Sequence, residues 1–134
     1  MTRAVWSVGK RIWALPWTLF GLAIGLVALA SGGHVRRYRG TLGFAGGGAR
    51  TFLRSFPFVR GASAMALGHV VLGQTDVDLD MSYDHELVHV RQYERWGPFF
   101  LPAYAAASLL ALARGGHAYD DNWFELEARH RRDP

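Results

Sequence analysis

The pentad His85-Glu86-Leu87-Val88-His89 constrains the structure of this 134-residue chain more than any other segment does. On a helix its two histidines lie one turn apart on the same face, so the pentad predicts a helix. Two imidazole nitrogens placed in this way can bind one metal ion, and Glu86 can hold and deprotonate a water molecule on it. The alternative is structural: two histidines on the polar face of an ordinary helix. We therefore take His85 and His89 as candidate metal ligands and Glu86 as the candidate catalytic residue.

The absence of cysteine limits which groups can hold a metal. Disulfides and thiolate metal sites are excluded, so any metal must be bound by histidine and carboxylate groups, and Zn²⁺ is the ion that we expect. The net charge of +4 is modest, and the sequence has no basic stripe with interleaved aromatic residues and no known nucleic-acid motif. We therefore expect no nucleic-acid partner.

An uncharged hydrophobic run (IWALPWTLFGLAIGLVALA) occupies residues 12–30. As a helix it would be about 28 Å long, close to the hydrocarbon thickness of a bilayer. Basic clusters on both sides suit anionic lipid headgroups, and Gly21 and Gly25 would let another helix approach closely. We expect a membrane helix, with membrane lipid as its partner. The alternatives are a signal peptide cleaved near Ala30 and a packed or interfacial helix of a compact fold.

Glycine-rich turns separate short apolar segments in the middle of the chain. The segments 51–58 and 65–72 are rich in apolar residues and predict strands, although Pro57 places the first at a sheet edge or breaks it. The alternating aspartates of residues 76–80 lack the glycine and closing glutamate of a calcium loop, so we interpret them as solvated turn residues. The middle of the chain therefore predicts a small sheet.

The C-terminal half predicts three helices. The first starts at Ser82 or Asp84 and runs to about Trp96, where a Gly-Pro pair ends it. The second, residues 99–113, carries no charge; at about 22 Å it is too short to cross a bilayer comfortably, which favours a buried or half-inserted helix. The third begins near residues 120–122.

A zinc ion held by two histidines needs a third protein ligand if a fourth position is to stay open for water. Glu125 and Glu127 are about 200° apart on a helix, so only one of them can face the two histidines. Glu125 has an alternative role, because Asn122 followed by Glu125 resembles a capping box. The residues alone leave both glutamates open. The further downstream candidates are His117, Asp120, Asp121 and His130.

The pentad, followed by Glu125-Leu126-Glu127-Ala128 on a later helix, resembles the gluzincin metallopeptidases. In that family the third zinc ligand is a glutamate on a later helix. In the membrane group related to the CAAX prenyl proteases, this glutamate opens a Glu-x-x-Ala-Asp pattern. Glu125 and Ala128 match that pattern, and Arg129 stands in the place of the aspartate. The resemblance implies Glu125 as the third ligand, without the family's supporting carboxylate.

A second resemblance covers residues 67–129 and is to small bacterial zincin-like proteins of unassigned function. It implies a minimal zincin core and a bacterial setting, and the hydrophobic run at residues 12–30 lies outside it. The matching segments are Gly68–Val71, His85–Gly97, Leu101–Tyr104 and Asn122–Glu125, with Trp123 where proline is expected.

Taken together, the sequence predicts an α+β fold with two parts. Residues 1–39 form an N-terminal hydrophobic helix with basic flanks. Residues 40–134 form a zincin-like domain with a small antiparallel-type sheet of about three strands and three helices. No feature predicts an oligomeric state.

The predicted function is that of a zinc metallopeptidase associated with the bacterial plasma membrane, acting on a peptide or protein substrate. The resemblance assigns Zn²⁺ to His85, His89 and Glu125, with Glu86 as the general base. His69 and Tyr93, together with Tyr83, are candidate contacts to substrate or oxyanion, although a hydrogen-bonded histidine on a sheet face is a common structural role for His69. The alternative is a non-catalytic membrane-associated protein with a structural zinc site or none. In a closed structural site, the fourth ligand would be Glu127, His117 or His130.

Overall fold

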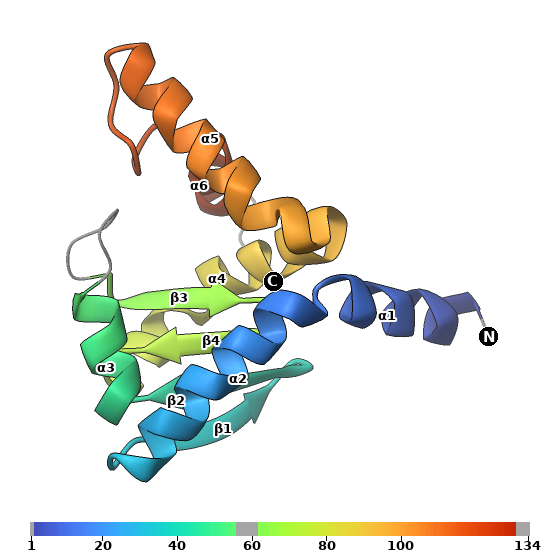
Figure 1. Ribbon diagram of the computed structural model, residues 1–134, viewed down its shortest axis with the longest axis vertical. Helices are drawn as coiled ribbons and strands as arrows, with labels where there is room; N and C mark the ends of the chain where they lie inside the picture. Colours follow the sequence, from blue (N-terminus) through green and yellow to red (C-terminus); the bar gives the residue numbers. More distant parts are fainter. Residues whose placement is uncertain (1, 56–61, 131–134) are drawn as a thin grey trace.

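The computed structural model describes residues 2–55 and 62–130 and confirms the α+β class (Figure 1). The strands are β1 (His34–Tyr38), β2 (Thr41–Ala45), β3 (Ala64–Leu67) and β4 (Val70–Gly73). The helices are α1 (Thr2–Trp13), α2 (Leu15–Ala30), α3 (Gly47–Arg54), α4 (Asp76–Trp96), α5 (Phe100–Ala113) and α6 (Trp123–His130), with a short 3₁₀ helix, η1 (Gly97–Phe99).

The four strands form one mixed sheet in the order β1-β2-β4-β3. The pairs β1–β2 and β3–β4 are antiparallel, whereas β2 and β4 are parallel. The sequence predicted an antiparallel sheet of about three strands, so both the number of strands and the direction of one pair differ from the prediction. The segment predicted as one strand, 65–72, is a hairpin. Gly68, with a φ of 61°, lies in the turn of this hairpin. The strand β3 is at the edge of the sheet.

The sheet separates two layers of helices (Figure 1). The first layer, α2 and α3, packs on one face of the sheet, and α4 packs on the other face beneath β3 and β4. Beyond the β3 edge, α5 and α6 extend from the end of α4, and α6 returns to contact it. This return brings the C-terminal helix back to the pentad.

The helix α2 belongs to this fold rather than standing apart from it. Its buried residues Gly21, Gly25 and Ala28 lie against the sheet, and a Cβ on Gly25 would lie 2.6 Å from the Phe44 ring. The glycine pair therefore admits the sheet, not a second helix. The alternative of a packed or interfacial helix describes α2, and α1 and α2 meet at Ala14 instead of forming one run.

The predicted boundary at residues 39/40 falls in the turn between β1 and β2. These strands pair from His34 with Ala45 to Tyr38 with Thr41, so residues on both sides of that boundary build one sheet.

The segment 51–58 was predicted as a strand, but its first residues complete helix α3. Ala49 and Leu53 are buried one turn apart, which is the period of a helix and not of a strand. Threonine and phenylalanine favour strands in isolation, and packing overrides that preference here. Residues 56–58 lie outside the described part of the chain.

The helix α4 starts earlier than predicted, so that the aspartates of residues 76–80 are helical and not in a turn. The Thr75 hydroxyl caps the helix by accepting a hydrogen bond from the Asp78 N–H at 3.0 Å. Asp76 and Asp78 lie in the first turn, where the helix dipole favours negative charge. The predicted end at Trp96 is confirmed.

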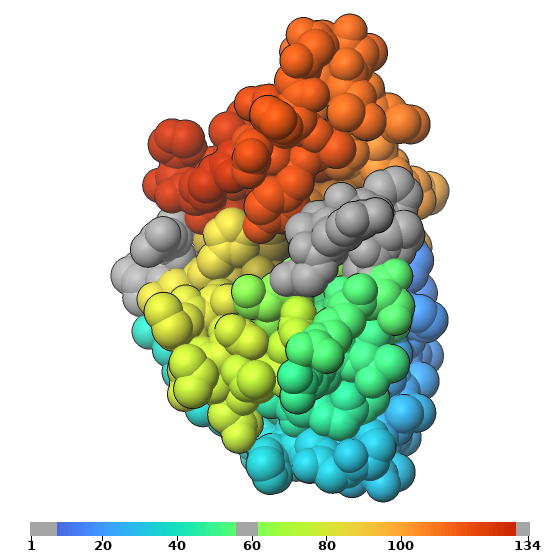
Figure 2. Space-filling view, turned by 90° about the vertical axis from the view of Figure 1, so that its left-hand side faces the viewer, coloured from blue at the N-terminus to red at the C-terminus, as the bar shows by residue number. Residues whose placement is uncertain are grey.

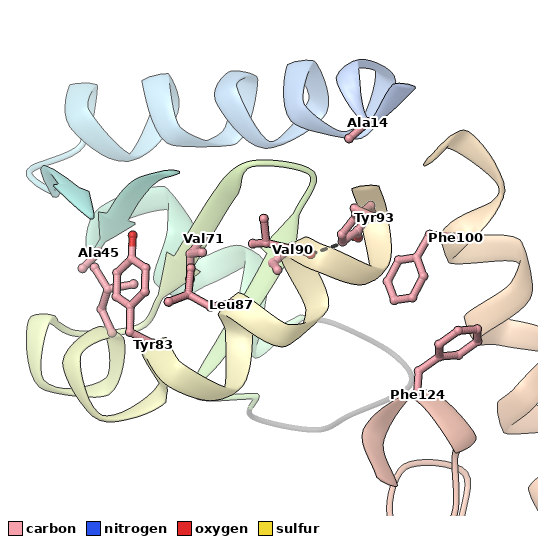
Figure 3. Close-up of a cluster of buried hydrophobic side chains, with 11 residues drawn as sticks. Ala14, Ala45, Val71, Tyr83, Leu87, Val90, Tyr93, Phe100 and Phe124 are labelled. Carbon is pink, nitrogen blue, oxygen red and sulfur yellow. Dashed lines mark hydrogen bonds between the residues drawn. The ribbon is translucent and has the colours of Figure 1, made fainter. Parts of the chain in front are cut away.

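One face of α4 is buried in the core between the sheet and α5 (Figure 3). Tyr83, Leu87 and Val90 pack beneath the sheet, and Phe100 and Phe124 continue the cluster to α5 and α6. With its apolar face fixed in this way, α4 presents its two histidines toward α6.

The contact between α2 and the sheet yields a stability prediction. We expect Gly25→Val to lower the free energy of unfolding by about 1–3 kcal/mol, because the new side chain would overlap the Phe44 ring. Ala23→Val, on the exposed side of the same helix, is the matched control and should change stability by much less. Denaturant unfolding followed by circular dichroism measures both, and equal effects would contradict the packing described here.

Candidate metal centre

Three side chains from two helices converge beside the middle of α4. The Nε2 atoms of His85 and His89 are 3.2 Å apart, and Glu125 Oε1 lies 2.9 Å from the first and 3.1 Å from the second. His89 and Glu125 are buried, and His85 is partly exposed. Within the described residues this is the group of histidine and acidic side chains that could hold a metal ion.

The spacing of these three atoms suits a small divalent cation. Donors at about 2.0–2.1 Å from a tetrahedral zinc ion are roughly 3.3 Å from one another. The three observed separations lie between 2.9 and 3.2 Å, so only small shifts would admit the ion. Two imidazoles and a carboxylate are also a donor set that zinc accepts. The residues present therefore fit the ion that the sequence predicted.

Glu125 reaches the histidines because α6 begins at a fixed point. The Asn122 side chain accepts a hydrogen bond from the Phe124 N–H at 2.8 Å and caps the helix. Its amide donates to the Tyr104 carbonyl and to Ser108 Oγ, which ties the start of α6 to α5. The predicted asparagine cap is present, but the Glu125 carboxylate faces the histidines.

Gln92 determines which nitrogen of His89 faces the cluster. Its side chain is fully buried, and its carbonyl oxygen accepts a hydrogen bond from His89 Nδ1 at 2.7 Å. Because Nδ1 carries the hydrogen that it donates in this bond, Nε2 is the nitrogen that remains available to a metal. The Gln92 amide donates to the Phe124 carbonyl and to Glu127, so it also connects α4 to α6.

The other predicted ligands lie elsewhere. Glu127 accepts hydrogen bonds from Gln92 and Arg95, farther along α4 than the two histidines. The Nδ1 atom of His130 lies 2.7 Å from the Leu126 carbonyl oxygen, and His117 donates its backbone N–H to Asp121. None of these residues joins the three-residue group.

The predicted substrate contacts are engaged elsewhere in the fold. His69 is in the turn of the β3–β4 hairpin, and its Nε2 lies 2.9 Å from Glu94 Oε2. Tyr93 lies beside the cluster, but its hydroxyl donates to the Ala66 carbonyl at 2.9 Å. Tyr83 pairs with Thr41 on the opposite side of the core. These side chains thus have partners within the protein, and their contact with a substrate or oxyanion stays a prediction; of the three, Tyr93 lines the cavity described below.

Two tyrosines near Glu125 were not predicted from the residues. The Tyr104 hydroxyl donates to Glu125 Oε2 at 2.5 Å, and the Tyr119 hydroxyl also hydrogen-bonds this carboxylate. Burial, followed by the negative charge of Glu125, raises the pKa of both tyrosines. Both hydroxyls therefore stay protonated and act as donors. Tyr104 belongs to a segment that matched the bacterial proteins, whereas no sequence signal indicated Tyr119.

Burial and neighbouring charge shape the ionisation of the cluster. Burial alone would lower the pKa of His89, but the Glu125 hydrogen bond and the charges of Glu86 and Glu125 raise it to about 9. Burial opposes ionisation of Glu125, yet hydrogen bonds from His85 and His89 hold its pKa far below the usual value. Burial raises the pKa of Glu86, against the charges of the two histidines. The metal-free cluster is therefore an ion pair beside a carboxyl group that is a stronger base than usual.

The cluster lines an apolar cavity of about 720 Å³. Glu86 lines this cavity together with the three candidate ligands. The edge strand β3 forms one wall through residues 64–66, and α5 forms another. The remaining wall is aromatic and aliphatic, from Trp17, Phe20, Phe52, Met65 and Leu101.

Comparisons of this chain with protein-family models, with curated proteins and with solved structures find no match. The interpretation of the site therefore rests on its geometry.

Zinc binding should depend on one glutamate of α6 and not on the other. We expect Glu125→Gln to weaken zinc affinity by more than about 100-fold, which is the upper range for a group that only supports a ligand. Glu127→Gln should stay close to wild type, because Glu127 is outside the donor group and a glutamine can still accept the hydrogen bonds from Gln92 and Arg95. Competition with a chromogenic chelator measures both. Equal affinities of the two variants would contradict this ligand set.

Gln92 should support binding without touching the metal. We expect Gln92→Met to lower zinc affinity by about 10–100-fold, because His89 Nδ1 loses its acceptor while the volume of the side chain is kept. In metal-free protein at a pH above the His89 pKa of about 9, where the ring is neutral, the ¹⁵N chemical shifts of His89 should show one tautomer in the wild type and a mixture of tautomers in this variant. Circular dichroism checks that the variant is folded. Unchanged affinity and tautomer would show that Gln92 only packs.

Proposed function

We propose that this chain is a zinc-dependent peptidase of the gluzincin type. One observation carries the proposal. The three-donor group and a buried carboxylate, Glu86, line the same cavity, which is bordered by the edge strand of the sheet. His85, His89 and Glu125 would hold the ion. When bound, zinc supplies a Lewis acid that polarises the scissile carbonyl and lowers the pKa of water toward neutrality.

Glu86 is the proposed general base. Its Oε2 lies 3.9 Å from His85 Nε2, on the side of the cluster that faces the cavity. Because burial raises its pKa, Glu86 binds a proton more readily than an exposed glutamate does and can later return it. It would accept a proton from the attacking water and pass it to the leaving amine.

The edge strand β3 is the proposed binding site for an extended peptide. The Ala66 N–H donates to the Glu86 carboxylate, and the Ala66 carbonyl accepts the Tyr93 hydroxyl, so its backbone groups point toward α4. Backbone direction alternates along a strand, and Ala64 therefore points its backbone groups the same way. The Ala66 groups are already bonded within the protein, so a peptide would pair with this edge at Ala64, beside the cavity that Glu86 lines.

The cavity favours substrates with apolar side chains. The side chains of Trp17, Phe20, Phe52 and Leu101 offer hydrocarbon surface and no charge, and the charged groups that line the cavity are those of the three-donor group and Glu86. We therefore propose an apolar peptide segment as the substrate.

We also propose a membrane location, at the bacterial plasma membrane, with α1 and α2 retained. Removal at Ala30 would uncover Phe44 and Val70, which α2 covers. Within the described residues, one helical stretch, Asp76–Ala113, is long and apolar enough to cross a membrane by length and composition. This stretch turns at Gly97, where φ is 58°, and its first half is the charged helix beneath the sheet.

Replacing Glu86 separates catalysis from metal binding. We expect Glu86→Gln to keep zinc affinity within a few-fold of wild type and to lower peptide hydrolysis by about 10²–10⁴-fold, the usual contribution of a general base. Glu94→Gln, on the same helix and paired with His69, is the matched control and should keep its activity. Cleavage of a set of quenched fluorescent apolar peptides measures turnover.

Unchanged turnover by Glu86→Gln rules out the proposed role of this residue. Zinc binding by the wild type without cleavage of any peptide in the set favours the structural site instead.

A further inference from the structure

The exposed side of α2 is apolar over its whole length. Leu19 and Leu26 are 56% and 64% exposed, and no charged residue occurs between positions 12 and 30. The hydroxyl of Thr18 is used within the protein, because it donates to the Ala14 carbonyl and accepts from the His69 N–H. This side therefore presents hydrocarbon without a hydroxyl or a charge to offer a partner.

The exposed side of α5 has the same character. Phe99, Leu109 and Leu110 are exposed, and residues 99–113 include no charge. The two hydroxyls of this segment are internal: Tyr104 donates to Glu125 and Ser108 to the Ala118 carbonyl.

These two surfaces join into one face, which we name the apolar face and define as the exposed sides of α2 and α5. The Trp13 and Phe99 rings are in contact, with centroids 6.1 Å apart, and Trp17 Nε1 donates to the Pro98 carbonyl. In both Figure 1 and Figure 2, α2 and α5 lie on one side of the molecule, while α4 and α6 lie on the other.

We propose that the apolar face binds the surface of an anionic phospholipid bilayer, with α2 and α5 lying in the plane of the membrane. The inference deepens the proposed membrane location and is independent of catalysis. With 16 and 14 residues, the helices are about 24 and 21 Å long, short of the roughly 30 Å needed to span the hydrocarbon. Helices of this kind lie along the interface.

Charge and hydrogen bonding favour lipid over a protein partner. The exposed cations Lys10 and Arg11 lie close to the junction of α2 with η1, and exposed Arg114 follows the far end of α5, so positive charge occurs at the junction and at one end of the apolar face. Arg11 also approaches the β1–β2 turn, where its guanidinium would lie 3.2 Å from a Cβ on Gly40. Specific protein interfaces carry about one hydrogen bond per 100–200 Å², whereas the hydroxyls of α2 and α5 are already bonded within the chain. Anionic headgroups beside hydrocarbon match this pattern.

Because the chain contains no cysteine, a single introduced cysteine can be labelled at a chosen position. Leu26→Cys and Leu109→Cys each place an environment-sensitive fluorophore on the apolar face. Met81→Cys, at a residue 82% exposed on α4, is the matched control. Metal-free protein is mixed with vesicles of phosphatidylcholine, with or without phosphatidylglycerol. We expect blue-shifted emission at positions 26 and 109 and no shift at 81, with at least tenfold weaker binding to vesicles without phosphatidylglycerol.

Flotation of the unlabelled chain gives a second readout. The double variant Leu19→Gln/Leu109→Gln should bind anionic vesicles at least tenfold more weakly than wild type, while Met81→Gln should bind equally. No vesicle binding, or an equal shift at position 81, overturns the proposal. If the emission shifts when the protein concentration is raised without vesicles, and gel filtration shows a dimer, a second copy of the chain covers the face instead. Because neither metal nor substrate is present, these outcomes do not depend on whether the chain is a peptidase.

Discussion

The buried carboxylate of Glu125 is the interaction on which the arrangement of the helices depends. It lies within 3.1 Å of both His85 and His89 on α4 and accepts the Tyr104 hydroxyl from α5, so one charged group connects three helices. A buried carboxylate without partners would cost several kcal/mol. Here burial is offset by hydrogen bonds, which hold its pKa low. Satisfying this one charge therefore helps to hold α6 against α4 and α5.

Buried amides provide the remaining polar connections between these helices. Gln92 and Asn122 are both fully buried, and each bonds to residues of a neighbouring helix. An amide can donate and accept at the same time, so it fixes the direction of the groups on either side of it. Through Gln92 the return of α6 and the orientation of the His89 ring are linked, because the same side chain contacts both. The geometry of the donor group is thus a property of the helix packing.

The predictability of the site and of the fold differed for physical reasons. The pentad fixed one helical face by itself, because spacing within a helix is local, and Gly97-Pro98 ended that helix where expected. The choice between Glu125 and Glu127 required the direction of α6, which depends on contacts distant in sequence. Tyr119 was missed for the same reason. The prediction of a strand at residues 51–58 was wrong because it gave more weight to β propensity than to the helical spacing of Ala49 and Leu53. The start of α4 was missed because the prediction did not consider Thr75 as a helix cap.

The donor group is a costly way to hold two helices together, and this cost bears on its function. Replacing a buried ion pair by apolar side chains of similar size is often neutral or stabilising, so stability alone does not require His89 and Glu125 at this position. Although burial opposes it, the Glu125 hydrogen bond and the charges of Glu86 and Glu125 raise the pKa of His89, so a divalent cation would displace a proton on binding here. Glu86 adds a second buried carboxylate with a raised pKa, at the wall of a cavity. Two carboxylates whose pKa values shift in opposite directions beside paired imidazoles support the proposed chemistry.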